Sequence, residues 1–273
     1  MYPTDVELFE FEASGAEPLP EGGQPGTVEN RGAVIWYGSY GAGTPVVLLH
    51  GGLGNSGNWG YQVPALLEAG FRALVIDSRG HGRSTRDEQP YSYELLASDV
   101  LAVLDALGIE KALLAGWSDG ACTALVLADR HPERAAGVFY FACNMDPSGA
   151  RPFEFTPVIG RCLARHQADY ARLSATPGAF EPFAEAVGQM QSTQPNYSAA
   201  DLARIRVPVT VVQSEHDEFI RREHAEYLAK AIPGARYVFL PGVSHFAPVQ
   251  KPEAFNEVLI AWAKGRHSLG NPY

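Results

Sequence analysis

The sequence has few cysteines, little basic charge and no long hydrophobic segment. Its 273 residues include 3 cysteines, Cys122, Cys143 and Cys162, an odd number that forms neither a disulfide framework nor a CxxC metal site. Lys and Arg number 21 against 31 Asp and Glu, for a net charge of −10, which argues against binding to nucleic acid or to an anionic membrane surface. No run of about 18 apolar residues occurs, so we expect no membrane-spanning helix.

Other features are also absent. The N-terminal residues are acidic and contain no apolar signal-peptide core, so we expect a cytoplasmic protein with reduced thiols. The sequence has no HExxH motif and no clustered ligand set, so we expect neither a metal nor an organic cofactor. The hydrophobic share of 46% is ordinary for a folded domain. Nothing in the sequence indicates an oligomeric state.

From residue 33 onward, short apolar segments alternate with longer amphipathic ones. Before that point we expect an edge strand over 6–12 and an irregular entry up to residue 30. Buried strands that alternate with helices are typical of a mostly parallel, doubly wound sheet, hence an α/β fold. The expected strands cover 33–36, 45–49, 73–77, 112–115, 137–142, 207–213 and 237–240. The expected helices cover 61–69, 93–107, 120–130, 222–231 and 252–264.

The alternation stops between residues 147 and 198. This stretch has helical patterns over 159–173 and 180–190 but no convincing strand. We interpret 147–198 as a helical cap inserted into a core that comprises 1–146 and 199–273.

The strongest motif is Gly116-Trp117-Ser118-Asp119-Gly120, which matches G-x-S-x-G and lies between a buried strand and a helix. A sharp strand-to-helix turn exposes the central serine, and glycines on either side let the strand and the helix approach closely. Ser118 is therefore the candidate nucleophile. The N–H of Asp119 is a candidate donor to the oxyanion that forms when the serine attacks a carbonyl.

A serine nucleophile needs a base and an acid that orients the base. His245 follows the last strand, so it emerges at the same carboxyl edge of the sheet as Ser118; His50 also follows a strand, but a structural role suits it better. Asp217 follows another strand, and Glu215, Glu218 and Asp146 remain alternatives to it. The order Ser118, Asp217, His245 is that of the α/β-hydrolase triad.

A second oxyanion donor is expected from a glycine loop that follows an earlier strand. The N–H of Gly52 is the preferred donor, with that of its neighbour Leu53 as the alternative. Leu53 is also a candidate substrate contact. The same loop also spells G-x-G-x-x-G over 52–57, with Asp77 20 residues further on, which resembles a dinucleotide fingerprint. His50 and Gly51 intervene between the strand and that fingerprint, which weakens the dinucleotide interpretation.

With these motifs in place, residues 30 to 265 resemble the α/β-hydrolase fold family, and the Gly-Trp-Ser-Asp-Gly pentapeptide is similar to that of its valacyclovirase-like (biphenyl-hydrolase-like) amino-acid ester hydrolases. The resemblance implies that Asp119 recognises a substrate α-amino group; the alternative is that Asp119 only supports the helix N-terminus. It also implies that the Asp77–Ser84 loop, with Arg79, is structural.

The sequence therefore predicts a serine hydrolase that cleaves a small carboxylic ester, with α-amino esters among the candidates. The same triad serves lactonases, aminopeptidases and C–C bond hydrolases. An NAD-dependent oxidoreductase and a non-catalytic ligand receptor are the alternatives from other classes. The expected partner is a small-molecule ester substrate.

Overall fold

The structure, a computed structural model, describes residues 5–265 and contains an eight-stranded sheet in the order β1-β2-β4-β3-β5-β6-β7-β8. The strands are β1 (Gln24–Asn30), β2 (Ala33–Tyr40), β3 (Pro45–Leu49), β4 (Arg72–Ile76), β5 (Ala112–Trp117), β6 (Ala135–Phe141), β7 (Val209–His216) and β8 (Arg236–Ser244). The α-helices are α1 (Phe9–Ser14), α2 (Gln62–Glu68), α3 (Tyr93–Ala106), α4 (Asp119–Arg130), α5 (Pro157–Leu173), α6 (Phe180–Thr193), α7 (Ala199–Leu202), α8 (Arg222–Ala231), α9 (Ala247–Gln250) and α10 (Pro252–Ala263).

The sheet is mostly parallel, as expected. β1 and β2 pair antiparallel with each other, and β2 pairs antiparallel with β4, whereas the pairs from β4 through β8 are parallel. Along β3, Val47 and Leu49 face the side covered by α3, α4 and α8, and Val46 and Leu48 face the side covered by α2 and α10. This alternation explains why the central strands are apolar throughout.

The expected strand over 6–12 is wrong. Residues Asp5–Leu8 form a 3₁₀ turn and Phe9–Ser14 form α1. The apolar–acidic alternation resembled a strand, but the side chains that become buried are Leu8 and Phe11, which lie three residues apart on one helical face. The first strand is instead β1, in the stretch expected to be irregular. It is an edge strand with no fully buried residue, so it carries little hydrophobic signal.

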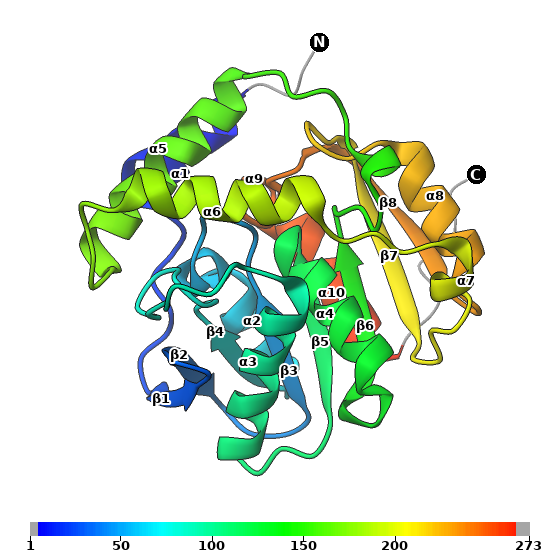
Figure 1. Cartoon of the computed structure of the whole chain (residues 1–273), viewed down its shortest axis with the longest axis horizontal. Helices are drawn as coiled ribbons and strands as arrows, with labels where there is room; N and C mark the ends of the chain where they lie inside the picture. Colours follow the sequence, from blue (N-terminus) through cyan, green and yellow to red (C-terminus); the bar gives the residue numbers. More distant parts are fainter. Residues whose placement is uncertain (1–4, 266–273) are drawn as a thin grey trace.

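Helices α5 and α6 lie between β6 and β7 in the sequence and cross above the carboxyl edge of the sheet (Figure 1). α5 also packs against α1, which joins the N-terminal segment to this upper layer. Within residues 5–265, no helix is both long enough and apolar enough to cross a bilayer. The carboxyl ends of the parallel strands therefore open toward a layer built mainly by α5 and α6.

Candidate active site

Ser118 occupies a strained turn between β5 and α4. Its backbone has φ 55° and ψ −123°, a conformation that non-glycine residues rarely adopt and that persists only where the surroundings impose it. A Cβ on Gly116 would lie 2.3 Å from the Gly120 carbonyl oxygen, and one on Gly120 would lie 2.1 Å from the Leu49 carbonyl oxygen. Both glycines are thus required by backbone that passes directly against them.

His245 and Asp217 are hydrogen-bonded. The imidazole Nδ1 of His245 lies 3.0 Å from Asp217 Oδ1 and 3.1 Å from Oδ2, and both side chains are buried. The backbone N–H groups of Phe219 and Ile220 each donate to Asp217 Oδ1 at 2.9 Å, and the Ser214 hydroxyl donates to Oδ2 at 3.2 Å. These donors fix the carboxylate against the ring, in the geometry that holds a catalytic histidine in one tautomer.

The alternative acids have other partners. Asp146 caps the turn at Ser148 and lies 3.8 Å from His224. Glu215 accepts the N–H of Gly242. Glu218 also contacts His245, but it accepts the backbone N–H of His245 at 3.0 Å rather than a ring N–H. Asp217 alone among these four carboxylates is bonded to the imidazole within the described residues.

The environment of His245 favours its charged form. Burial by itself lowers the pKa of His245, but the charge and hydrogen bond of Asp217, with further negative charge from Glu218 and Asp119, raise the pKa above its ordinary value. An imidazole with a raised pKa is a stronger base for the serine proton.

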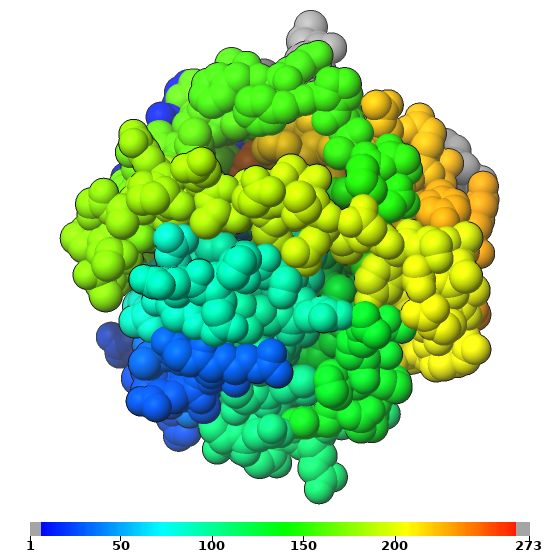
Figure 2. Space-filling view, viewed as in Figure 1, coloured from blue at the N-terminus to red at the C-terminus, as the bar shows by residue number. Residues whose placement is uncertain are grey.

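Ser118 and His245 face one cavity of about 470 Å³, which opens as the hollow beside α6 in Figure 2. Among residues 5–265, no hydrogen bond joins the Ser118 hydroxyl to the imidazole. In ligand-free enzymes this contact is often long and tightens when substrate binds. The structure thus brings Asp217 and His245 into contact and places Ser118 on the same cavity; the roles of the three side chains stay predictions.

The glycine loop after β3 lies beside the serine. A Cβ on Gly51 would lie 3.3 Å from the Ser118 Cβ, and Gly52 and Leu53 line the same cavity. Leu53 has φ 63°, which turns the loop sharply. The backbone N–H groups of Gly52 and Asp119 thus belong to the two turns that meet at Ser118, and their role as oxyanion donors stays a prediction.

Asp119 is a buried carboxylate on the cavity wall. It is only 6% exposed, and it accepts hydrogen bonds from the Tyr93 hydroxyl at 2.8 Å and from the Gln191 amide at 2.9 Å. Burial raises its pKa, and these two hydrogen bonds offset part of the rise. No ion pair to Asp119 exists among the described residues, so its charge has neutral donors but no counter-ion. Sequence reasoning missed Tyr93 and Gln191, because they come from α3 and α6 and carry no motif.

The other polar residues of the expected motifs have structural partners. The Ser78 N–H donates to His50 Nε2 at 3.0 Å, which leaves Nδ1 to donate to the Gly51 carbonyl at 2.8 Å. Asp77 is fully buried and accepts N–H donors from Ser56 at 2.7 Å and from Arg83 at 2.8 Å. A carboxylate enclosed in this way is not available to a ribose, which removes the main support for the dinucleotide interpretation.

Arg79, as expected, is structural. Its side chain is fully buried, and its Nε and Nη2 donate to the two carboxylate oxygens of Asp99 at 3.0 and 2.7 Å. Nη2 also donates to the Asn30 carbonyl at 2.8 Å. This bidentate pair anchors the loop after β4 to α3 and β1.

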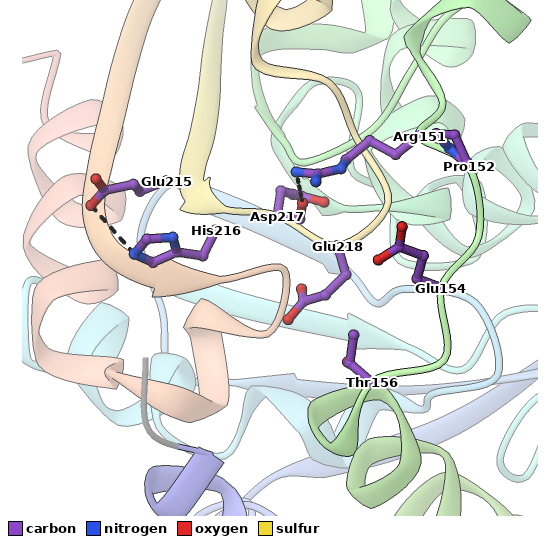
Figure 3. Close-up of a pocket in the computed structure, with 8 residues that line it drawn as sticks. All are labelled: Arg151, Pro152, Glu154, Thr156, Glu215, His216, Asp217 and Glu218. Atoms are coloured by element: carbon purple, nitrogen blue, oxygen red, sulfur yellow. Dashed lines mark hydrogen bonds and ion pairs between the residues drawn. The ribbon is translucent and has the colours of Figure 1, made fainter. Parts of the chain in front are cut away.

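A second cavity of about 330 Å³ lies beside the loop after β7 that carries Asp217 (Figure 3). Arg151, Pro152, Glu154 and Thr156 line it from the segment that leads into α5, and Glu215–Glu218 line it from the end of β7. Arg151 Nη1 donates to the Asp217 carbonyl at 3.0 Å, which ties the two sides together. This cavity is mainly polar. The cavity of about 470 Å³ that Ser118 faces, which we call the catalytic cavity after its proposed role, lies on the other side of the segment and is mainly apolar.

The three cysteines are buried free thiols, and within residues 5–265 no group of three His, Cys, Asp or Glu side chains is placed to hold a metal ion.

Comparison with known proteins identifies relatives across most of the chain. Residues 46–258 match the model of the alpha/beta hydrolase family. The putative carbamate hydrolase RutD of Azorhizobium caulinodans is 31% identical over 84% of this chain and 95% of its own length.

Solved structures of hydrolases are also similar to this chain. Est816, described as degrading N-acyl homoserine lactones, has a TM-score of 0.66 and 30% identity, over 86% of this chain and 98% of its own. The enol-lactonase of Burkholderia xenovorans LB400 has a TM-score of 0.69 and 26% identity, over 88% of this chain and 100% of its own. These similarities concern the hydrolase fold and family; they do not single out the valacyclovirase-like group.

Proposed function

Because this chain belongs to the alpha/beta hydrolase family, we propose that it is a serine hydrolase that cleaves a small carboxylic ester through an acyl-enzyme. Ser118 is the nucleophile, His245 the general base and then the general acid, and Asp217 the residue that orients His245. The N–H groups of Gly52 and Asp119 form the oxyanion hole.

In the proposed reaction, His245 Nε2 takes the Ser118 proton as the hydroxyl oxygen attacks the ester carbonyl. The carbonyl oxygen becomes an oxyanion held by the two N–H groups, each of which can contribute about 3 kcal/mol. The imidazolium then protonates the leaving alcohol, and the acyl group stays on Ser118. A water molecule, activated by the same imidazole, hydrolyses this ester and restores the serine.

The observation that carries the proposal is the bond of 3.0 Å between Asp217 and His245 Nδ1, on the wall of the cavity that Ser118 enters from its strained turn. The bond leaves Nε2 as the nitrogen that can accept the serine proton. Ser118 and His245 line that cavity, and Asp217 supports His245 from behind.

Labelling with a fluorophosphonate tests this proposal. We expect one adduct per chain in the wild type and none in Ser118→Ala, together with loss of ester hydrolysis. Thr123→Ala is a matched control, because that hydroxyl lies on α4, which directly follows Ser118, and donates to the Asp119 carbonyl. Labelling of Ser118→Ala to the wild-type level would refute the assignment of the nucleophile.

We also propose that the ester carries an α-amino group that binds Asp119. A buried carboxylate without a counter-ion attracts a cation more strongly than one that faces water. Ethyl alaninate and ethyl isobutyrate differ in that a methyl group replaces the amine. Asp119→Asn keeps the side-chain shape and should lower kcat/KM for the alanine ester at least tenfold more than for isobutyrate. Equal losses on the two esters would contradict amine recognition and leave Asp119 as a support for α4.

Lactone hydrolysis is the second candidate. The N-acyl homoserine lactone-degrading enzyme and the enol-lactonase are both at least 25% identical to this chain, and the same triad opens a cyclic ester by the same steps. A panel that compares γ-butyrolactones with open-chain esters of the same carbon count separates the two by the ratio of kcat/KM values.

A further inference from the structure

The segment 150–156, which we call the strap, separates the two cavities and alternates in character. Pro152, Glu154 and Thr156 line the polar cavity, and Phe153 and Phe155 line the catalytic cavity. Figure 3 shows the polar side, with Glu154 and Thr156 on the strap opposite Glu218. This period of two is that of an extended chain with distinct faces.

The strap is fixed at both ends. Ala150 forms a β-bridge with Ile220, and the Arg151 N–H donates to the Phe219 carbonyl at 2.7 Å. At the other end, the Thr156 hydroxyl accepts the N–H of Ile159 at 3.2 Å and caps α5. The bridge sets the strap directly beside the loop that carries Asp217, which aligns Phe153 with Phe219.

Phe153 and Phe155 are 67% and 66% exposed although they line the cavity. They are the two most exposed large hydrophobic side chains in the described part of the chain. Exposed apolar side chains that adjoin a binding cavity mark a contact surface more often than isolated ones do. Their surface would leave water if an apolar group occupied the cavity mouth.

Phe219 connects this surface to the proposed base. Its ring lies 6.4 Å from that of Phe153, nearly parallel at 25°, and 4.7 Å from the imidazole of His245, edge to face at 73°. The polar residue Asp119 lies instead next to Ser118 in the sequence and bonds to Tyr93 and Gln191. The cavity therefore has an apolar side beside the histidine and a polar side beside Asp119.

The proposed reaction determines which part of the ester lies against the apolar side of the cavity. The alcohol leaves with the proton that the imidazolium donates, so it must lie next to His245. We infer that Phe153, Phe155 and Phe219 form the binding site for an apolar alkyl or aryl alcohol moiety of the substrate. This inference rests on the proposed function and specifies the substrate class of the same site.

A matched series of esters tests the inference. Ethyl, butyl and hexyl esters of isobutyrate and of alanine lengthen the alcohol by two and four carbons, and ethyl isobutyrate, ethyl 2-methylpentanoate and ethyl 2-methylheptanoate lengthen the acyl part by the same numbers. In the wild type, kcat/KM should rise with alcohol length. In the Phe153→Ala/Phe155→Ala double variant, the hexyl-to-ethyl ratio should fall about tenfold, the scale of apolar pocket contacts, and the acyl series should keep its wild-type slope.

Phe9→Ala is the control, because Phe9 is 48% exposed on α1, outside the catalytic cavity. It should leave the hexyl-to-ethyl ratio at its wild-type value. An unchanged ratio in the double variant, or a loss confined to the acyl series, would overturn the inference. If the two rings instead pack against a second copy of the chain, the double variant would change the molecular mass of the protein in solution and leave the hexyl-to-ethyl ratio unchanged. That result would also overturn the inference. Failure of the wild type to hydrolyse any ester would refute the proposed function itself.

Discussion

Replacing Asp217 by Asn tests the proposed triad most sharply, because the surroundings dictate how the amide must sit. Oδ1 of Asp217 accepts two backbone N–H groups, from Phe219 and Ile220, at 2.9 Å each. An amide NH₂ in the Oδ1 position would face these two N–H donors, so the asparagine oxygen must occupy that position. The NH₂ group then occupies the Oδ2 position, 3.1 Å from His245 Nδ1 and near the Ser214 hydroxyl.

In that arrangement the amide NH₂ lies 3.1 Å from Nδ1 and competes for it with the amide oxygen at 3.0 Å. Where the NH₂ donates to Nδ1, the proton of the imidazole sits on Nε2, and Nε2 can then no longer take a proton from Ser118. The negative charge that stabilises the imidazolium is lost as well. We therefore expect the ester kcat/KM to fall on the order of 10⁴-fold, or about 5 kcal/mol of transition-state stabilisation.

The assay is initial-rate hydrolysis of the best ester of the panel, with the rate of fluorophosphonate labelling as a second readout. Asp146→Asn is the matched control, since Asp146 follows β6 but lies near His224 rather than His245. It should retain activity within a few-fold of the wild type. An Asp217→Asn variant that keeps a tenth or more of the wild-type rate would refute the reasoning.

Three further outcomes follow from the geometry. Gly120→Ala should lower the free energy of unfolding by about 3 kcal/mol or more, because its Cβ meets fixed backbone, whereas Gly188→Ala, with open space around its Cβ, should raise it by about 0.5–1 kcal/mol in urea unfolding. Arg79→Leu leaves the buried Asp99 carboxylate without its bidentate partner and should cost about 3–5 kcal/mol in the same assay; a cost below 1 kcal/mol would contradict the anchor. Because the pKa of His245 is raised and its neutral form is the base, kcat/KM should decline as pH falls through a value above 6.5, and a midpoint below 6.5 in the pH profile would contradict the environment described.

The sequence predicted the central sheet well because its strands are buried on both faces and bounded by helices of clear periodicity. The strand 45–49 and the helix 222–231 have the expected bounds. The prediction for the N-terminal segment was wrong because an apolar–acidic alternation fits a strand as well as a short helix. The packing of this segment against α5 decides between the two. The edge strand β1 was missed for the opposite reason: it is too exposed to show a pattern.

The sequence likewise predicted one part of the candidate site and not the other. Ser118, Asp217 and His245 each follow a strand, so topology alone brings them to one edge of the sheet. Tyr93, Gln191 and the strap phenylalanines come from helices and an extended segment whose positions depend on tertiary packing. No local spacing encodes those positions, so the sequence could identify the reacting groups but not the walls around them.

Because α5 and α6 are inserted between two neighbouring strands, this part of the chain can change its substrate selectivity without disturbing the sheet. The chain leaves the sheet after β6 and returns at β7, so this excursion can vary in sequence while the strands keep their pairing. The turn that strains Ser118 tolerates no such variation, since a Cβ on Gly116 or Gly120 would meet fixed backbone. In the loop held by His50, a Cβ on Gly52 or Gly54 would lie 2.6 Å from a neighbouring side chain. A mutant library confined to residues 150–193 should therefore yield many folded variants with altered selectivity, and an equally dense library in the glycine loops should yield mostly unfolded ones.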